Sequence, residues 1–150
     1  MVDKILKERK MKKVKLLFKS TIYIYIHIPY CKSQCPYCAF FKQVGNREDL
    51  TDFFLRDLDS YETNFSEFEV KSIYFGGGTP SLFSASFFEK IINKIGKKIS
   101  LNPSVEITIE INPNTLKTEN LRELKQAGIT RPSFGIQAFN KIGEKNLLKF

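Results

Sequence analysis

Four short segments rich in β-branched and aromatic residues alternate along the chain with segments whose apolar residues recur at helical spacing. The former are typical of strands, and apolar residues three and four positions apart indicate helices. The expected strands are Thr21–Ile28, Val70–Phe75, Ser104–Ile111 and Pro132–Gln137. Because the alternation is regular and the connections are short, it predicts parallel strands joined by right-handed crossovers. The sequence therefore predicts an α/β fold of about four parallel strands with outer helices.

Capping and stop residues place the expected helices between these strands. The first expected helix covers 46–64. The second is capped by Ser84 or Ser86 and stopped by Gly96, and the third is capped by Thr118 and closed by Gly128. A further helix is expected to begin near Lys141. Pro132 lacks the N–H group of a strand ladder, and we therefore place it at the start of the fourth strand.

The loops that follow parallel strands lie at one rim of a sheet, where α/β proteins build their sites. The chemically informative residues of this chain occur in those loops. Three cysteines follow the first strand and Gly76–Gly78 follow the second, while Glu110 and Gln137 end the third and fourth. We expect these four segments to meet at one place.

The stretch "HIPYCKSQCPYC" contains every cysteine of the chain, namely Cys31, Cys35 and Cys38. Thiolates suit zinc and iron–sulfur clusters. A cluster of four irons would be held by three thiolates with one iron left open, and an open iron can bind a substrate. Zinc with His27 as a fourth ligand is the alternative, although His27 lies in the expected strand and a proline separates it from the loop. Three unrelated buried thiols are a weaker interpretation, since unrelated cysteines would not cluster.

An odd number of clustered cysteines argues against the disulfide framework of a secreted domain. No apolar stretch approaches the roughly 18 residues of a membrane span. The apolar run at 16–18 is also too short for the core of a signal peptide. These features predict a protein of a reducing cytoplasm.

The formal net charge of +8 is concentrated at the start of the chain. Residues 1–20 carry eight Lys and Arg against two acidic residues, whereas the other 130 residues have a net charge of only +2. We expect residues 1–20 to form a flexible, solvated basic leader rather than a nucleic-acid-binding segment. Peripheral contact with an anionic membrane surface stays an alternative for this leader.

Four motifs, in order, resemble one enzyme family. "YIHIPYCKSQCPYC" resembles the cluster loop of radical S-adenosylmethionine (SAM) enzymes, and its Tyr-x-His-Ile-Pro start resembles the oxygen-independent coproporphyrinogen III oxidase superfamily. "YFGGGTPSLF", "IEINPNTL" and "GITRPSFGIQAFN" resemble later motifs of that superfamily. The resemblance covers about residues 21–145 and implies a partial, TIM-like (β/α) radical SAM barrel, truncated after about four strands.

The resemblance also implies cofactors and their ligands. In this family three cysteines hold a [4Fe-4S] cluster, SAM chelates the open iron, and an electron donor reduces the cluster so that SAM is cleaved to a radical. Cys31, Cys35 and Cys38 match the cluster ligands. The positions that match SAM contacts are Tyr25, Tyr37, Gly76, Gly77, Gly78, Thr79, Glu110 and Gln137. No catalytic residue is assignable.

Each of these roles has a plainer alternative. A glycine triplet also makes a tight turn, and the two tyrosines also suit core packing. His27 matches a family histidine near the cluster, where it would tune the cluster by hydrogen bonding. His27 is otherwise an ordinary strand residue.

The superfamily contains oxidases that decarboxylate coproporphyrinogen III and a haem chaperone group that binds haem and transfers it to client haemoproteins. The oxidases typically have a further cysteine two positions after the last ligand, whereas this chain has Ala39-Phe40 after Cys38. Tyr37 and Phe40 match the chaperone pattern, and Ala39 departs from its usual acid. The resemblance therefore favours the chaperone group, with haem or porphyrin as the ligand and the oxidase as the alternative.

Members of this family are well over twice as long as this chain, with about six strands and a separate C-terminal domain. We therefore expect residues 21–150 to be the N-terminal part of a radical SAM core, without the rest of the barrel and the C-terminal domain. A truncated, inactive fragment that binds only the cluster is a further alternative.

Overall fold

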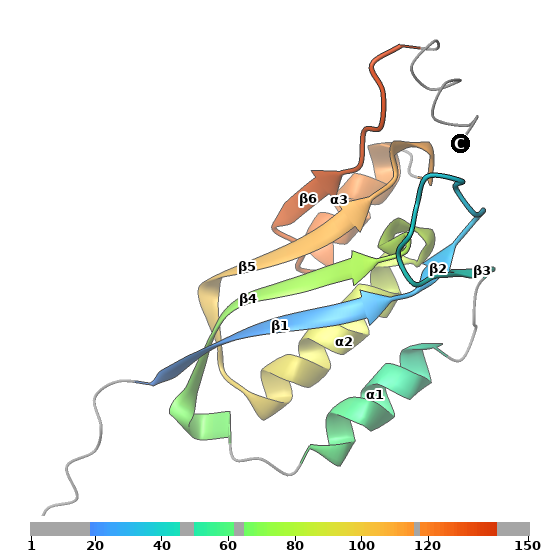
Figure 1. The fold of residues 1–150 in the computed structure, drawn as a ribbon. Helices are drawn as coiled ribbons and strands as arrows, with labels where there is room; N and C mark the ends of the chain where they lie inside the picture. Colours follow the sequence, from blue (N-terminus) through green and yellow to red (C-terminus); the bar gives the residue numbers. More distant parts are fainter. Residues whose placement is uncertain (1–18, 46–49, 62–64, 116–117, 141–150) are drawn as a thin grey trace, which may run out of the picture.

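The computed structural model describes residues 19–45, 50–61, 65–115 and 118–140 (Figure 1). The strands are β1 (Ser20–Ile28), β2 (Tyr30–Cys31), β3 (Gln43–Val44), β4 (Phe68–Gly77), β5 (Leu101–Ile111) and β6 (Arg131–Phe134). The helices are α1 (Leu50–Ser60), α2 (Ala85–Lys98) and α3 (Thr118–Gln126), with short 3-10 turns at Phe65–Glu67, Pro80–Leu82 and Pro113–Thr115. Of the expected basic leader, 1–18 lie outside the described residues, as does the helix expected from Lys141.

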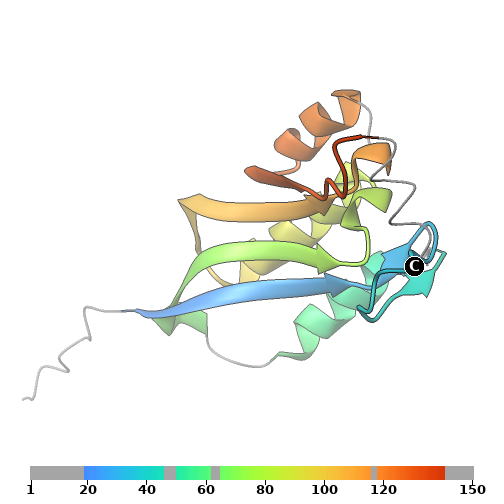
Figure 2. The same cartoon turned by 45° about the horizontal axis from the view of Figure 1, so that its top comes forward.

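The main sheet has the order β1-β4-β5-β6, and every neighbouring pair is parallel. The predicted α/β fold of four parallel strands with outer helices is thus confirmed. Figures 1 and 2 show α1, α2 and α3 on one face of this sheet, as right-handed crossovers require. On the other face, the β1 side chains of Tyr23 and Tyr25 are 73% and 59% exposed, so no described helix covers them.

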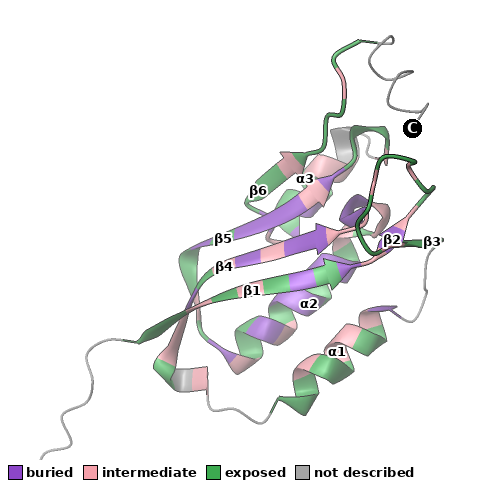
Figure 3. Ribbon diagram, viewed as in Figure 1, coloured by how far each residue is buried: buried purple, intermediate pink, exposed green. Residues whose placement is uncertain are grey.

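The core lies between β4, β5 and the inner side of α2 (Figure 3). The central strands are rich in fully buried aliphatic residues, as expected for parallel strands covered by helices. The rings of Phe75 and Phe88 pack edge to face with centroids 5.0 Å apart, and both side chains are fully buried. Such pairs favour this geometry because the ring edge is positive and the ring face negative.

Two helix boundaries test the expected stop signals. Gly128 has φ +101°, and α3 closes there with Gly128 N–H donating to Lys125 O (3.1 Å) and Ile129 N–H to Leu124 O (3.0 Å). These two bonds form the Schellman motif, for which glycine is suited. The expected stop at Gly96 is wrong, because α2 continues to Lys98 and Gly96 has no left-handed backbone. Ser84 is the residue before α2, but its side chain makes no capping hydrogen bond.

The other boundaries differ from the expected ones by a few residues. The expected fourth strand ends at Phe134 rather than Gln137. Gly135 N–H still bonds to Ile111 O (2.9 Å), but the chain then turns, with Ile136 N–H bonding to Phe134 O at 3.1 Å. The first helix ends at Ser60, and residues 46–49 and 62–64 of its expected range lie outside the described residues. Pro132 is the second residue of β6, an edge of the described sheet, where a missing N–H is tolerated.

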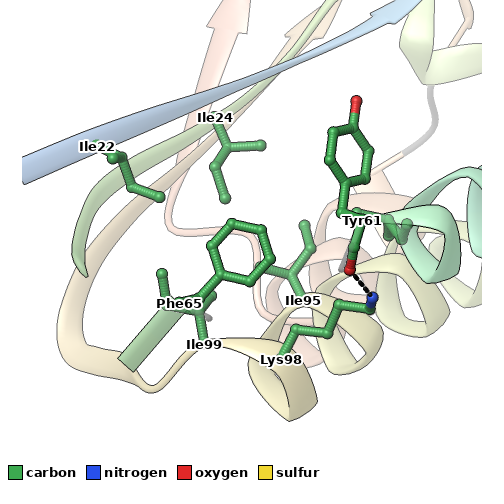
Figure 4. A pocket seen from close by; sticks show the side chains of 8 residues that line it. Ile22, Ile24, Tyr61, Phe65, Ile95, Lys98 and Ile99 are labelled. Atoms are coloured by element: carbon green, nitrogen blue, oxygen red, sulfur yellow. Dashed lines mark hydrogen bonds between the residues drawn. The ribbon is translucent and has the colours of Figure 1, made fainter. Parts of the chain in front are cut away.

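A small apolar pocket lies near the amino-terminal half of β1 (Figure 4). It has a volume of about 50 Å³ and is lined by Ile22, Ile24, Leu58, Tyr61, Phe65, Ile95, Lys98 and Ile99. Lys98 Nζ closes one side by donating to the Tyr61 carbonyl oxygen at 2.9 Å. Because ligand pockets usually exceed about 300 Å³, this pocket is a packing gap between β1 and the helices.

Within the described ranges, no helix is long and apolar enough to cross a membrane.

We predict that Phe88→Ala lowers the free energy of unfolding by about 3–5 kcal/mol, because it removes a fully buried ring and leaves a cavity. Phe53→Ala on α1 is the matched control, since Phe53 is 48% exposed and should cost far less. Chemical denaturation followed by circular dichroism measures both values. An equal loss in the two variants would contradict this placement of the core.

Candidate functional site

The loop after β1 and the carboxyl ends of β4, β5 and β6 surround a hollow of about 540 Å³, which we call the rim hollow. Its lining is Cys31, Ser33, Cys35, Tyr37, Cys38, Ala39, Phe40, Lys42, Gly77, Gly78, Thr79, Glu110, Ile111, Asn112, Ser133, Phe134, Gly135 and Gln137. The four loops that the sequence singles out therefore meet at one place. Two of the expected site residues, Tyr25 and Gly76, lie beside the hollow and do not line it.

Residues 31–42, the cysteine loop, project beyond the ends of β1 and β4 (Figure 1). The loop is closed at its base by the β2–β3 pair, by Gln43 N–H bonding to Pro29 O (2.7 Å) and by Gly45 N–H bonding to Cys31 O (3.0 Å). Within it, Cys38 N–H donates to Cys35 O at 3.1 Å. These backbone bonds hold all three cysteines on one side of the rim hollow.

The three thiols are free and partly exposed, as metal ligands must be before a metal binds. The pKa of the Cys38 thiol is lowered, first by the backbone of Phe40 and then by the ammonium group of Lys42. The Lys42 ammonium also donates to the Cys38 carbonyl oxygen. A positive charge near a thiol favours the thiolate, which is the form that binds metal.

Among the residues that the structure describes, no group of three or more His, Cys, Asp or Glu side chains is gathered tightly enough to hold one metal ion. A zinc site draws four ligands onto a single metal, whereas the cysteines of a [4Fe-4S] cluster bind separate irons. His27 Nδ1 lies 3.0 Å from the Tyr25 hydroxyl, within hydrogen-bond distance. The three thiols are therefore not gathered around a single point in this structure, and the Tyr25 hydroxyl occupies one of the two ring nitrogens of His27.

The glycines at 76–78, the glycine turn, let the end of β4 approach the start of the cysteine loop. A Cβ on Gly78 would lie 2.6 Å from Tyr30 O, and one on Gly77 would lie 2.8 Å from Ile28 O. Gly77 also has φ +114°, a backbone conformation that other residues rarely adopt. Gly78 N–H donates to Ile28 O at 2.7 Å, so the two segments are joined as well as close.

Thr79 follows the glycine turn and is buried. Its N–H donates to Tyr30 O at 2.7 Å, and its hydroxyl donates to Cys31 Sγ at 3.5 Å. The sequence places Thr79 at the site, and the structure adds that its side chain contacts a cysteine sulfur.

Among the residues that the structure describes, Glu110 supplies the one carboxylate in the lining of the rim hollow. Its Oε1 accepts a hydrogen bond from the Tyr74 hydroxyl (2.8 Å), and its Oε2 accepts one from Gly77 N–H (3.0 Å). Sequence reasoning missed Tyr74. The available signal was strand alternation, because Tyr74 and Gly76 are two positions apart on β4 and so point to the same face.

Of the remaining expected site residues, two line the rim hollow and one lies on the open face of the sheet. Tyr37 and Gln137 line the rim hollow from the cysteine loop and from the segment after β6. Tyr25 lies on the open face of the sheet, where its ring stacks beside that of Tyr74 with centroids 6.0 Å apart. The core-packing alternative does not describe Tyr25 or Tyr37, which are 59% and 39% exposed.

We predict that Gly78→Ala lowers the free energy of unfolding by about 1–3 kcal/mol, because its Cβ would collide with a backbone carbonyl that cannot move aside. Gly96→Ala is the matched control: the nearest atom to its Cβ is Leu101 Cδ1 at 3.7 Å, an ordinary contact. Because Gly96 lies within the last turn of α2, this change should stabilise by up to about 1 kcal/mol. Chemical denaturation measures both, and a neutral Gly78→Ala would contradict the close approach.

Comparison with known proteins bears on what this site is. Residues 25–149 match the radical SAM superfamily. The chain is 41% identical over 123 residues to the "Heme chaperone HemW" of Buchnera aphidicola subsp. Schizaphis graminum, covering 79% of this chain and 33% of that protein. It is 32% identical over 127 residues to the "Oxygen-independent coproporphyrinogen III oxidase" of Bradyrhizobium diazoefficiens, covering 81% of this chain and 28% of that protein.

A solved structure agrees with these matches. The coproporphyrinogen III oxidase HemN of Escherichia coli, a radical SAM enzyme, superposes with a TM-score of 0.75 at 25% identity, over 88% of this chain and 31% of that chain. The chain thus spans about a third of the length of the relatives it matches. Since the family match covers the cysteine loop, the glycine turn and Glu110, the family expected from the motifs is confirmed, and the chain belongs to the radical SAM superfamily.

Proposed function

We propose that the rim hollow binds a [4Fe-4S] cluster and SAM, the two cofactors that membership of the radical SAM superfamily implies. One observation carries this proposal: three thiols from the cysteine loop, the glycine turn at the end of β4 and the carboxylate of Glu110 at the end of β5 line the same hollow. When bound, the cluster supplies a low-potential electron that opens SAM to radical chemistry.

The residues present fit these groups. Cys31, Cys35 and Cys38 would each hold one iron, which leaves the fourth iron for SAM. The bare backbone of Gly77 and Gly78 leaves room for the methionyl end of SAM, and Glu110 would accept hydrogen bonds from its ammonium or ribose groups. Thr79, Tyr37 and Gln137 complete the lining. Tyr25 and Gly76 would act from beside the hollow.

We predict that anaerobic reconstitution of the chain gives about four irons and four sulfides per molecule, since three thiolates are available to a four-iron cluster. Cys35→Ala should lose most of this iron, whereas Gln34→Ala, an exposed neighbour on the same loop that does not line the rim hollow, should retain it. Metal analysis, sulfide analysis and the visible spectrum measure the outcome. Stoichiometric zinc without iron in anaerobically purified protein would overturn the proposal.

We further propose that the complete protein handles haem and belongs to the chaperone group. The supporting observation is local: Ala39 and Phe40 follow the last cysteine, where the oxidases have an additional cysteine. The relative at 41% identity is named a heme chaperone, and the oxidase relative is 32% identical. In this proposal the partners are haem, client haemoproteins and an electron donor, in a reducing cytoplasm where thiols stay free.

The oxidase is the second candidate function, and a chimera separates the two. We predict that Buchnera aphidicola HemW, with this chain in place of its matching third, binds haem and leaves coproporphyrinogen III unchanged when supplied with SAM and a reductant. Haem binding is followed by absorbance, and porphyrins are separated by chromatography under anaerobic conditions. SAM-dependent loss of two propionate carboxyl groups would make the oxidase correct. A chimera that keeps its cluster and does neither would favour the inactive, cluster-binding alternative.

A further inference from the structure

The carboxylate of Glu110 is held at both of its oxygens. Tyr74 Oη donates to Oε1 at 2.8 Å, and the backbone N–H of Gly77 donates to Oε2 at 3.0 Å. Both donors belong to β4, whereas Glu110 belongs to β5, its parallel neighbour. Two separate donors on one planar group fix its rotation as well as its position.

The Tyr74 ring is itself held in place. It lies directly over the backbone of Gly76, because a Cβ on Gly76 would lie 2.8 Å from Tyr74 Cε1 and 3.2 Å from Glu110 Oε2. On the side of β1, the ring of Tyr25 stacks against it at 6.0 Å between centroids with an interplanar angle of 28°. The absence of a side chain at Gly76 is therefore explained by the ring and the carboxylate that close over it.

Tyr74 is suited to remain a donor. Its pKa is raised from the ordinary value, first by burial of the phenol and then by the hydrogen bond to Glu110 and the charge of that carboxylate, which together outweigh the lowering by the Ser133 side chain and the charge of Arg131. The phenol therefore keeps its proton under neutral conditions, and that proton is directed at Glu110 Oε1.

We infer that Tyr74 is a positioning residue, which sets the orientation in which Glu110 meets SAM in the rim hollow. The inference rests on the proposed function, because only that proposal makes Glu110 a SAM ligand. A carboxylate oxygen has two acceptor sites, so one bond to each oxygen leaves the others free for a ligand. A group that is already oriented binds more tightly, because no rotational freedom is lost on binding.

The first test is Tyr74→Phe, which removes the hydroxyl and keeps the ring and its stacking. We expect the dissociation constant for SAM, measured by calorimetry on the anaerobically reconstituted chain, to rise about tenfold, as for the loss of a hydrogen bond to a charged group. Tyr23→Phe is the control, because Tyr23 lies on β1 two positions from Tyr25, is 73% exposed, and is outside the rim hollow. The Tyr23→Phe variant should bind SAM with the same affinity as the wild type.

The second test asks whether Tyr74 acts through Glu110. Glu110→Gln should weaken SAM binding by itself, and Tyr74→Phe should then add little in the Glu110→Gln background. A tyrosine that only stabilised the sheet would weaken binding by the same factor in both backgrounds. Equal factors, or an unchanged affinity in Tyr74→Phe alone, would overturn the inference and leave the proposed function intact. Failure of the wild-type chain to bind SAM at millimolar concentration would overturn both.

A third measurement needs no cofactor. In the cofactor-free chain with 13C-labelled tyrosine rings, the Tyr74 resonance, identified by its loss in Tyr74→Phe, reports the ionisation of its phenol. Because the Glu110 carboxylate raises the Tyr74 pKa, Glu110→Gln should lower the pH at which Tyr74 ionises. An unchanged ionisation would show that the two groups do not interact, and would overturn the inference whatever the SAM measurements gave.

Discussion

The site depends on the contact between the end of β4 and the first residues after β1. There Gly78 N–H bonds to Ile28 O and Thr79 N–H bonds to Tyr30 O, each at 2.7 Å. The approach requires glycine at position 78, because a Cβ there would lie 2.6 Å from Tyr30 O. This contact carries the cysteine loop on one side and Gly77, with its bond to Glu110, on the other. A displacement at this contact would therefore change the distance between the thiols and the Glu110 carboxylate.

The two faces of the sheet carry different kinds of side chain. One face is covered by helices, and its buried apolar residues supply the core. The other face carries tyrosines and charged groups, among them Arg131, whose guanidinium lies 3.7 Å from Glu106 and 3.4 Å from the Thr108 hydroxyl. Because the polar side chains need not serve the core, the rim at the strand ends can hold reactive groups at little cost in stability.

The convergence of the site could be predicted from the sequence, because parallel strands fix which loops share a rim. The position of Glu110 at the end of the third expected strand likewise placed it at the rim. The Gly96 stop was wrong because a glycine ends a helix only where the backbone turns left-handed, which neighbouring residues decide. Strand alternation could have placed Tyr74 on the same face as Gly76, but its hydrogen bond to Glu110, 36 residues away in sequence, depends on the register of β4 and β5.

The strand order β1-β4-β5-β6 follows the order of the chain. Each new strand therefore adds to the edge left by the one before, without waiting for a distant segment to be inserted between its neighbours. During synthesis, which proceeds from the amino terminus, the thiols emerge first, then the glycine turn, then Glu110, with Gln137 last. The cysteine loop therefore reaches its final position only after β4 has paired with β1 and the glycine turn has bonded to Ile28 O.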